Sequence, residues 1–317
     1  LVTAVCVMLA TYAASATTTG TPATSATYAT SAASAPVRPL PFFYDLYTFR
    51  GDEGATTVVA AFAVEAGRLE EEKEEWAVRY RFDVTLILSD TVSQTVSRTD
   101  DSVFVRLPRS LGGDHLLHTH VDVEAPPSGT TVQRVIMSDA TTPGRGQLYS
   151  SPFAIPDYRG SELMLSDIAL GLPDAEVGWK RGDAVLALLP TSRFPESAFD
   201  VYYEIYNLPS DNPYTTEITV EPIDVSGAPR LGGGDPVRLR FTGESPAGAD
   251  GTVDELRRVE SSLEEGFYRL TVTVTDEASG ERASTARTFE VTGWSPGTTM
   301  VPALPRTWRA IRTRGGR

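Results

Sequence analysis

The sequence predicts an all-β protein built from two antiparallel β-sandwich modules in tandem. Short segments of alternating or β-branched hydrophobic residues recur through residues 38–293, and the breaks between them carry Gly, Pro, Asp or Ser. Long amphipathic helices and a regular strand–helix alternation are missing from the pattern, which argues against Rossmann-type and barrel enzymes. The length of 317 residues fits two domains of ordinary size.

The first module is expected over residues 38–157. Its clearest strand is 76–89, where the even positions from Trp76 to Leu88 are apolar and polar residues such as Arg79 occupy odd positions. A period of two indicates a strand with one buried face. Further strands are expected at 56–64, 102–107, 116–124 and 130–138.

The second module is expected over residues 158–293. Its strands are predicted at 162–170, 183–189, 200–207, 215–224, 237–242, 267–276 and 282–292. The last two flank a turn that contains Gly280, so they are predicted to form an antiparallel hairpin. Leu256, Val259 and Leu263 have a helix-like spacing, which predicts one short helix over 253–263.

The N-terminal residues are typical of an exported protein. Residues 1–16 are mostly apolar and end in Ala14-Ser15-Ala16, the pattern of a signal-peptide remnant with its cleavage site, and the uncharged Thr/Ala/Ser-rich residues 17–37 are predicted to form a linker. The alternative is the end of a membrane-spanning helix. Both interpretations place the body outside the cytoplasm, in the periplasm or cell envelope or in the extracellular space, and the first predicts no stable membrane span in the mature chain.

Charge is distributed unevenly along the chain. Residues 37–293 carry all 42 acidic residues and 23 of the 28 basic ones, a formal charge of −19, which disfavours nucleic acid as a partner. Residues 294–317 carry five arginines and no acid, and we expect a basic flexible tail there. Such a tail can tether the body to an anionic surface, fold on a partner, or be attracted to its own acidic body. The single cysteine, Cys6, lies in the apolar run, which excludes disulfides and thiolate metal sites from the mature chain.

All three histidines lie within six residues, and two of them define a candidate metal site. On a strand over 116–124, His118, His120 and Asp122 point to one face while apolar residues point to the other. Two imidazoles at i and i+2 with a nearby carboxylate are a set of ligands that suits a divalent metal. The alternative is that these residues form a polar outer face of the sheet. Apart from this metal, the sequence predicts no cofactor.

An aromatic cluster in 199–207 defines a candidate binding surface. Alternation places Val201, Tyr203 and Ile205 inward, so Tyr202 and Tyr206 point outward, where they are candidates for stacking on a sugar or a peptide. The alternatives are that they fill an interface between the modules or cover the sheet.

Two segments of the sequence resemble known protein families. Leu263, Gly266 and Tyr268, just before an alternating strand, resemble the tyrosine corner of immunoglobulin-like and fibronectin type III-like sandwiches. That resemblance implies Ig-like modules in which the Tyr hydroxyl bonds the backbone across the turn.

The chain also resembles the β-rich region of secreted bacterial proteins that carry a GWxTD domain, over roughly residues 40–292. The residues that carry this resemblance are Phe153, Ile155, Pro156, Asp157, Tyr158 and Gly160, then Leu165, Ser166, Asp167, Ile168 and Leu170, with the hairpin over 267–291. The naming motif is absent, because Gly293-Trp294 is followed by Ser295-Pro296. The resemblance implies an exported envelope protein.

These observations predict a non-catalytic binding or structural module of the bacterial cell envelope or extracellular space, with a protein or glycan as its partner. One alternative is a metal-binding protein or metal-dependent enzyme that uses His118, His120 and Asp122. A second alternative is the extracytoplasmic part of a longer membrane protein.

Overall fold

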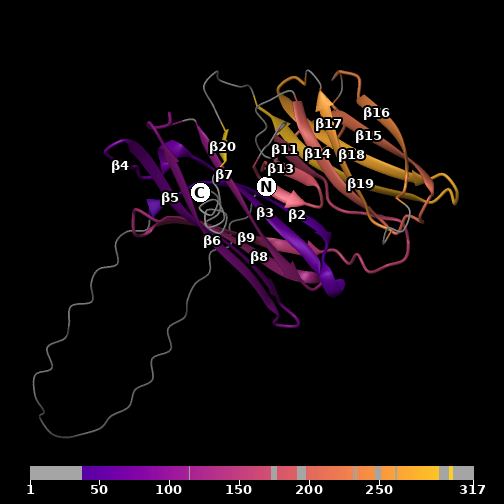
Figure 1. Cartoon of the computed structure of the whole chain (residues 1–317), viewed down its shortest axis with the longest axis horizontal. Coiled ribbons are helices and arrows are strands. Elements are labelled where there is room, and N and C mark those ends of the chain that lie inside the picture. Colours follow the sequence, from indigo (N-terminus) through magenta and orange to yellow (C-terminus); the bar gives the residue numbers. More distant parts are fainter. Residues whose placement is uncertain are drawn as a thin grey trace, which may run out of the picture. The chain divides into compact units, whose positions relative to one another are not determined.

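Strands joined by turns make up the folded part of the chain, as Figure 1 shows for the computed structural model. The structure describes residues 38–113, 115–172, 177–190, 198–230, 232, 234–246, 251–260, 263–292 and 300–302. Within these residues the strands form four sheets, and the helical segments are two single 3₁₀ turns, Asp52–Gly54 and Ala66–Arg68. The prediction of an all-β, mainly antiparallel fold is confirmed. No helix among the described residues is long and apolar enough to cross a membrane.

The first two sheets form one sandwich. One sheet contains β1 (Arg38–Pro39), β9 (Arg145–Ile155), β8 (Ser128–Asp139), β5 (Ala77–Asp90) and β4 (Glu72–Glu74), with β6 (Val96–Leu107) also paired to β5. The other contains β2 (Phe43–Arg50), β3 (Thr56–Glu65), β7 (Leu116–Ala125) and β20 (Met300–Pro302). The even positions of β5 from Val78 to Leu88 are buried against β3, as the period of two predicts. Trp76 lies in the turn before β5 and is 80% exposed, so the strand begins one residue later than predicted.

The other two sheets form a second sandwich. One contains β10 (Met164–Leu165), β14 (Ala198–Tyr206), β11 (Ala169–Leu172), β13 (Ala184–Leu188) and β12 (Trp179–Arg181), with β17 (Val253–Glu260) also paired to β14. The other contains β16 (Val237–Glu244), β15 (Pro213–Ile223), β18 (Gly266–Asp276) and β19 (Arg282–Val291). The predicted hairpin is formed by β18 and β19. Ahead of it, the Tyr268 hydroxyl donates to the Glu264 carbonyl at 2.8 Å, the bond that a tyrosine corner makes.

One expectation about secondary structure is wrong. Residues 253–260 form strand β17 rather than a helix, because they pair with β14 along eight residues and bury Val253, Glu255 and Val259 at alternate positions. Tertiary pairing overrides the local spacing of apolar residues. Within the expected flexible tail, Met300–Pro302 pairs in parallel with β7. The rest of residues 294–317 and the N-terminal residues 1–37 lie outside the described residues.

The two sandwiches pack against each other through their sheet faces. A third buried cluster joins β2 and β3 of the first sandwich to the β11–β14 sheet of the second. Its members are Tyr47, Phe49, Val59, Ala61, Ala169, Trp179, Ala184, Leu186, Leu188 and Tyr202. In β3 and β14 nearly every residue is buried, since one face of each strand packs inside its own sandwich and the other faces the neighbouring sandwich. We call this contact the junction.

Candidate functional site

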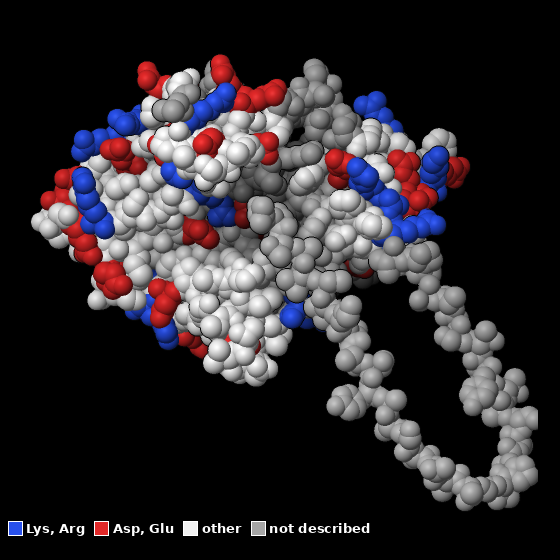
Figure 2. All heavy atoms as spheres, turned by 180° about the vertical axis from the view of Figure 1, so that it is seen from behind, with Lys and Arg blue, Asp and Glu red and all other residues white. Residues whose placement is uncertain are grey.

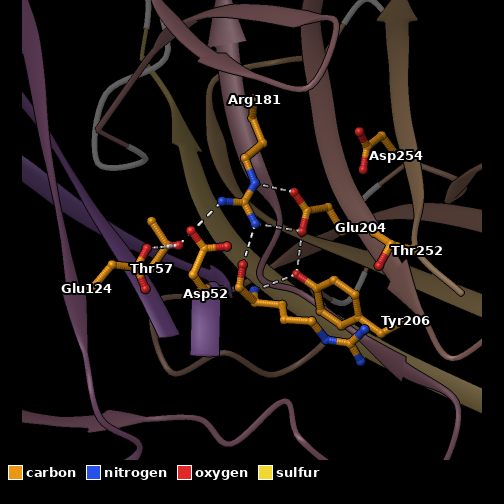
Figure 3. Close-up of a pocket in the computed structure, with 10 residues that line it drawn as sticks. Asp52, Thr57, Glu124, Arg181, Glu204, Tyr206, Thr252 and Asp254 are labelled. Carbon is orange, nitrogen blue, oxygen red and sulfur yellow. Dashed lines mark hydrogen bonds and ion pairs between the residues drawn. The ribbon is translucent and has the colours of Figure 1, made fainter. Parts of the chain in front are cut away.

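A polar cleft opens at one side of the junction. It has a volume of about 270 Å³ and takes its walls from both sandwiches. The residues that line it are Arg50, Gly51, Asp52, Thr57, Glu124, Arg181, Glu204, Tyr206, Thr252 and Asp254. This volume is slightly below the range of ordinary small-molecule pockets, so the cleft fits a small polar group or one side chain of a larger partner. Figure 3 shows Arg181 between Glu204 and Thr57.

A buried ion pair forms the floor of the cleft. Glu204 on β14 is 2% exposed, and the Arg181 side chain on β12 is 26% exposed. Arg181 Nε donates to Glu204 Oε1 at 2.6 Å, and Nη2 donates to Oε2 at 3.2 Å. The Tyr202 hydroxyl donates to Oε1 at 2.8 Å, and the Tyr206 hydroxyl donates to Oε2. Each carboxylate oxygen therefore accepts two hydrogen bonds, which offsets the cost of burying the charge.

The same arginine connects the two sandwiches. Arg181 Nη2 donates to the Arg50 carbonyl, and Nη1 donates to Thr57 Oγ1 at 3.3 Å. The Thr57 hydroxyl donates onward to Glu124 Oε1 at 2.6 Å. Gly51 lies beside this chain of bonds, and a Cβ there would lie 1.9 Å from Glu124 Oε2, so a larger residue would displace the Glu124 carboxylate. The wall from the first sandwich is thus tied to the floor from the second.

Arg50 covers the aromatic side of the floor. Its guanidinium lies 4.2 Å from the centre of the Tyr206 ring, a cation–π contact. Its backbone N–H donates to the Tyr206 hydroxyl at 2.8 Å, and Nη2 donates to Asn207 Oδ1 at 2.8 Å. The ring of Tyr206 is therefore held in one position and shielded from solvent.

Electrostatics fix the protonation of the floor. Burial and the charge of Glu204 raise the pKa of Tyr202 and of Tyr206 far above the ordinary value, so both hydroxyls stay protonated as donors. Burial opposes the charge of Arg181, but hydrogen bonding to Glu204 and the charge of Glu204 outweigh it and raise the pKa of Arg181. The exposed acidic side chains on the cleft walls are Asp52, Glu124 and Asp254. The mouth of the cleft is therefore negative and its floor is neutralised internally.

The prediction that Tyr202 and Tyr206 lie on an exposed surface is wrong. Both are 0% exposed, because the outer face of β14 is covered by the first sandwich. Tyr202 packs against Trp179 and Phe49, with ring centres 5.4 and 5.7 Å apart, and Tyr206 packs against Tyr158 at 5.2 Å. The two tyrosines fill the junction, as the alternative of an interface between the modules predicts.

The predicted metal ligands follow one strand but do not converge. His118 is 5% exposed, His120 is half-buried and Asp122 is exposed, so burial decreases along β7. Burial lowers the pKa of each histidine to about 4. His118 Nε2 has no hydrogen-bond partner within the described part of the chain. Among the described residues, no group of three or more His, Cys, Asp and Glu side chains is placed to hold a metal ion. The three residues therefore face the junction without forming the predicted site.

A second charged network crosses the junction away from the cleft. Arg287 on β19 donates from Nη2 to Asp45 Oδ1 and to the Leu46 carbonyl, both at 2.6 Å, and its side chain is only 12% exposed. Its guanidinium lies 4.2 Å from the centre of the Tyr47 ring. Nη1 lies 3.7 Å from Asp167 Oδ1, and the other oxygen of Asp167 accepts bonds from the N–H and hydroxyl of Thr48.

Little in the sequence predicts these two networks. No pattern distinguishes Arg181, Glu204 and Arg287 from the other charged residues, since acids and arginines are common throughout this chain. One signal was present, because Glu204 stands between Tyr202 and Tyr206 on a strand that is otherwise apolar. A carboxylate inside such a strand needs partners if the strand is buried. Figure 2 shows charged side chains of both signs scattered over one face of the molecule.

Comparison with known proteins does not assign the chain to a family. No protein-family model matches it, and no curated protein sequence does. Similar solved structures include red sea bream transglutaminase, with 13% identity and a TM-score of 0.21, where the match covers 80% of this chain and 31% of that one. Another is Bacteroides uniformis β-glucuronidase 2, a D341A D367A calcium-binding mutant, with 9% identity, a TM-score of 0.25 and coverage of 77% and 27%. A Bacteroides uniformis β-glucuronidase has 10% identity, a TM-score of 0.24 and coverage of 76% and 26%. The chain spans about a third or less of these proteins, and likenesses at this level define neither a family nor an activity.

Proposed function

We propose that this chain is an exported, non-catalytic binding module of two Ig-like β-sandwiches, which acts in the bacterial cell envelope or the extracellular space. The observation that carries the proposal is the cleft at the junction, whose walls come from both sandwiches. A partner held there contacts both sandwiches at once, so its affinity depends on the fixed packing between them.

The chemistry of the floor supports binding rather than catalysis. Glu204 accepts hydrogen bonds from Arg181, Tyr202 and Tyr206, so its lone pairs are already used. A general base needs a free lone pair aimed at the substrate. The floor instead holds the walls of the cleft in position. The exposed carboxylates of Asp52, Glu124 and Asp254 contact the partner, and they favour hydroxyl or cationic groups of a glycan or a protein.

Sequence features support the cellular location and the family relationship. The apolar residues 1–16 with Ala14-Ser15-Ala16 favour export. The bond from Tyr268 to the Glu264 carbonyl supports an Ig-like second sandwich. Two residues from the GWxTD-like segments also lie at the junction, where Tyr158 and Asp167 both bond Thr48. A relationship to the β-rich region of GWxTD-domain proteins is therefore part of the proposal.

Binding is tested by probing glycan and peptide arrays with the purified protein, a cleft variant and a control. Glu124→Gln/Asp254→Asn removes two wall charges, and Asp100→Asn/Asp101→Asn removes two charges from β6, outside the cleft lining. We expect at least one array ligand to bind the wild type and the control, and to bind the cleft variant about tenfold more weakly or worse. Binding that is equal in all three proteins, or no binding on either array, contradicts the proposal.

Export is tested separately by expressing the chain behind an initiator Met and a basic n-region in a bacterial host. Mass spectrometry of the product then locates its N-terminus. We expect a protein outside the cytoplasm that begins directly after Ala16. An uncleaved protein retained in the cytoplasm contradicts this part of the proposal.

A further inference from the structure

Strand β6 forms an exposed edge of the first sandwich. It pairs with β5 along its whole length, and none of the described strands pairs with its other side. Proteins commonly protect such edges with a proline, with a bulge or by keeping the strand short, because an open edge can pair with a second chain. β6 is 12 residues long, contains no proline and keeps one register with β5 from Val96 to Leu107. Its edge is therefore suited to accept a further strand.

Two opposite charges lie side by side on the outer face of this strand. Arg98 Nε lies 3.4 Å from Asp100 Oδ1, and the two side chains are 59% and 64% exposed. Val103 and Val105, at the alternate positions of the strand, are buried, so Arg98 and Asp100 point away from the core of the sandwich. Both charges are therefore accessible to a strand that pairs with this edge.

A second copy of β6 can meet these charges around a two-fold axis. In an antiparallel pair of identical strands, the axis passes through one residue, which then faces its own copy. An axis at Arg98, Asp100 or Asp101 places a charge opposite the same charge, which is destabilising. An axis at Thr99 places Arg98 of each copy opposite Asp100 of the other, so two pairs of opposite charges form at once.

One other register of two copies also brings opposite charges together. An axis at Val103 places Asp100 opposite Arg106. Arg106 Nε already donates to Glu74 Oε2 at 2.8 Å within its own chain, so this register competes with an existing contact between β6 and β4. The contact between Arg98 and Asp100 lies within β6 itself, which favours the axis at Thr99.

We propose that two copies of this chain form a weak dimer in which their β6 strands pair antiparallel around a two-fold axis at Thr99. The sheet that contains β5 and β6 then continues from one copy into the other. The dimer is weak because the contact is a short ladder, exposed ion pairs contribute little, and each chain has a formal charge of −14. The proposal goes beyond the binding function, since β6 does not line the cleft.

Sedimentation equilibrium of the purified chain tests the dimer. We expect a monomer at about 10 µM and mostly dimer at about 1 mM, because a contact of this size is typical of weak association. Array probing at about 1 µM or below uses the monomer, so this dimer does not alter the test of the cleft. Amides of residues 97–100 should exchange more slowly as the protein concentration rises.

Charge reversal on β6 tests which residues meet. Arg98→Asp and Asp100→Arg each place like charges opposite one another at both contacts, so each should raise the dissociation constant of the dimer about tenfold or more. Both side chains are exposed, so the variants should remain folded. Arg134→Asp makes the same change on the exposed face of β8, which is paired on both sides within the same sheet, and should match the wild type.

Mixing the two variants in equal amounts separates the proposed register from other contacts. A chain with Arg98→Asp then faces a chain with Asp100→Arg, and opposite charges meet at both positions. The mixture should therefore dimerise at concentrations where each variant alone is monomeric. A wild type that stays monomeric at about 1 mM overturns the proposal. A dimer that Arg98→Asp leaves unchanged, or a mixture that stays monomeric, overturns it as well.

Discussion

Two arginines from the second sandwich cross the junction, and they differ in what they hold. Arg287 forms its ion pair with Asp45 of the first sandwich, so opposite charges face each other across the contact. Arg181 pairs with Glu204 of its own sandwich and reaches the first sandwich only through the Arg50 carbonyl and the Thr57 hydroxyl. The Arg287 side chain is 12% exposed and the Arg181 side chain is 26% exposed, beside an open cleft.

The two arginines therefore have different structural roles. An ion pair that crosses the junction is lost when the sandwiches part, so Arg287 contributes directly to holding them together. The pair between Arg181 and Glu204 survives separation, so its main effect is to give the floor of the cleft a fixed form. The four predictions below test this division.

Arg287→Met is expected to have the largest effect. It leaves the carboxylates of Asp45 and Asp167, which are 20% and 32% exposed, without this cation. Breaking a fully buried pair costs about 3–5 kcal/mol, and we expect a loss near the lower end of that range for these partly buried groups. Urea denaturation measures the loss of unfolding free energy. Arg282→Met, at the exposed start of β19, is the control and is expected to change stability by about 0.5 kcal/mol or less. A loss below about 1 kcal/mol for Arg287→Met would show that Arg287 does not hold the two sandwiches together.

Acid is expected to weaken the junction through His118 and His120. Burial lowers the pKa of each from 6.5 to about 4, so the folded protein keeps both neutral while the unfolded chain takes up protons first. Stability is therefore complete above about pH 6.5 and is lost as the pH falls toward 4. Two such histidines contribute on the order of 2–4 kcal/mol between pH 7 and pH 5. The variant His118→Asn/His120→Asn should lose most of this pH dependence in denaturation curves, and an unchanged slope would contradict the assignment.

Glu204→Gln is expected to cost about 2–3 kcal/mol, because it removes the charge that balances Arg181 and replaces one carboxylate oxygen with an NH2 group, so one of the two tyrosine hydroxyls loses its acceptor. Glu217→Gln, on the exposed side of β15, is the matched control. Glu204→Gln should also lose array ligands that Glu217→Gln retains. If Glu204→Gln and Glu217→Gln were equally stable, the floor would not depend on the ion pair.

Tyr268→Phe is expected to have the smallest effect. It removes the bond to the Glu264 carbonyl within the second sandwich, a loss of about 1 kcal/mol. The hydrophobic packing at position 268 is retained, because the phenyl ring still packs on Phe289, whose ring centre lies 5.6 Å from that of Tyr268. Hydrogen exchange in the first sandwich should not change, since this residue takes no part in the junction. A rise there would show that the two sandwiches are coupled by routes other than the two arginine networks.

The strands and their inward faces were predictable, whereas the junction was not. The period of two in β5 and the turn at Gly280 are local properties, and both were recognised from the residues alone. The outer face of β14 was also located correctly, but local pattern does not distinguish solvent from a second sheet. The near-continuous apolar run of β3 does indicate that both faces of this strand are covered, because a strand buried on both faces lacks polar alternation.

The site was harder to predict for the same reason. Arg181 and Glu204 lie 23 positions apart on different strands, and Arg287 lies 242 positions from Asp45. No spacing rule links such residues, since the contacts depend on how the two sandwiches pack. For His118 and His120, the spacing of i and i+2 correctly predicts that both lie on one face of β7. The spacing does not predict that this face meets the junction.

Hydrogen exchange of Arg287→Met tests most directly whether the two sandwiches behave as one unit across the junction. The substitution lies on β19 of the second sandwich, while its partners Asp45 and Leu46 lie on β2 of the first. We predict faster exchange in β2 and β3 as well as in β19, because the junction opens when the cation is removed. Faster exchange confined to β18 and β19, with β2 and β3 unchanged, would contradict the account.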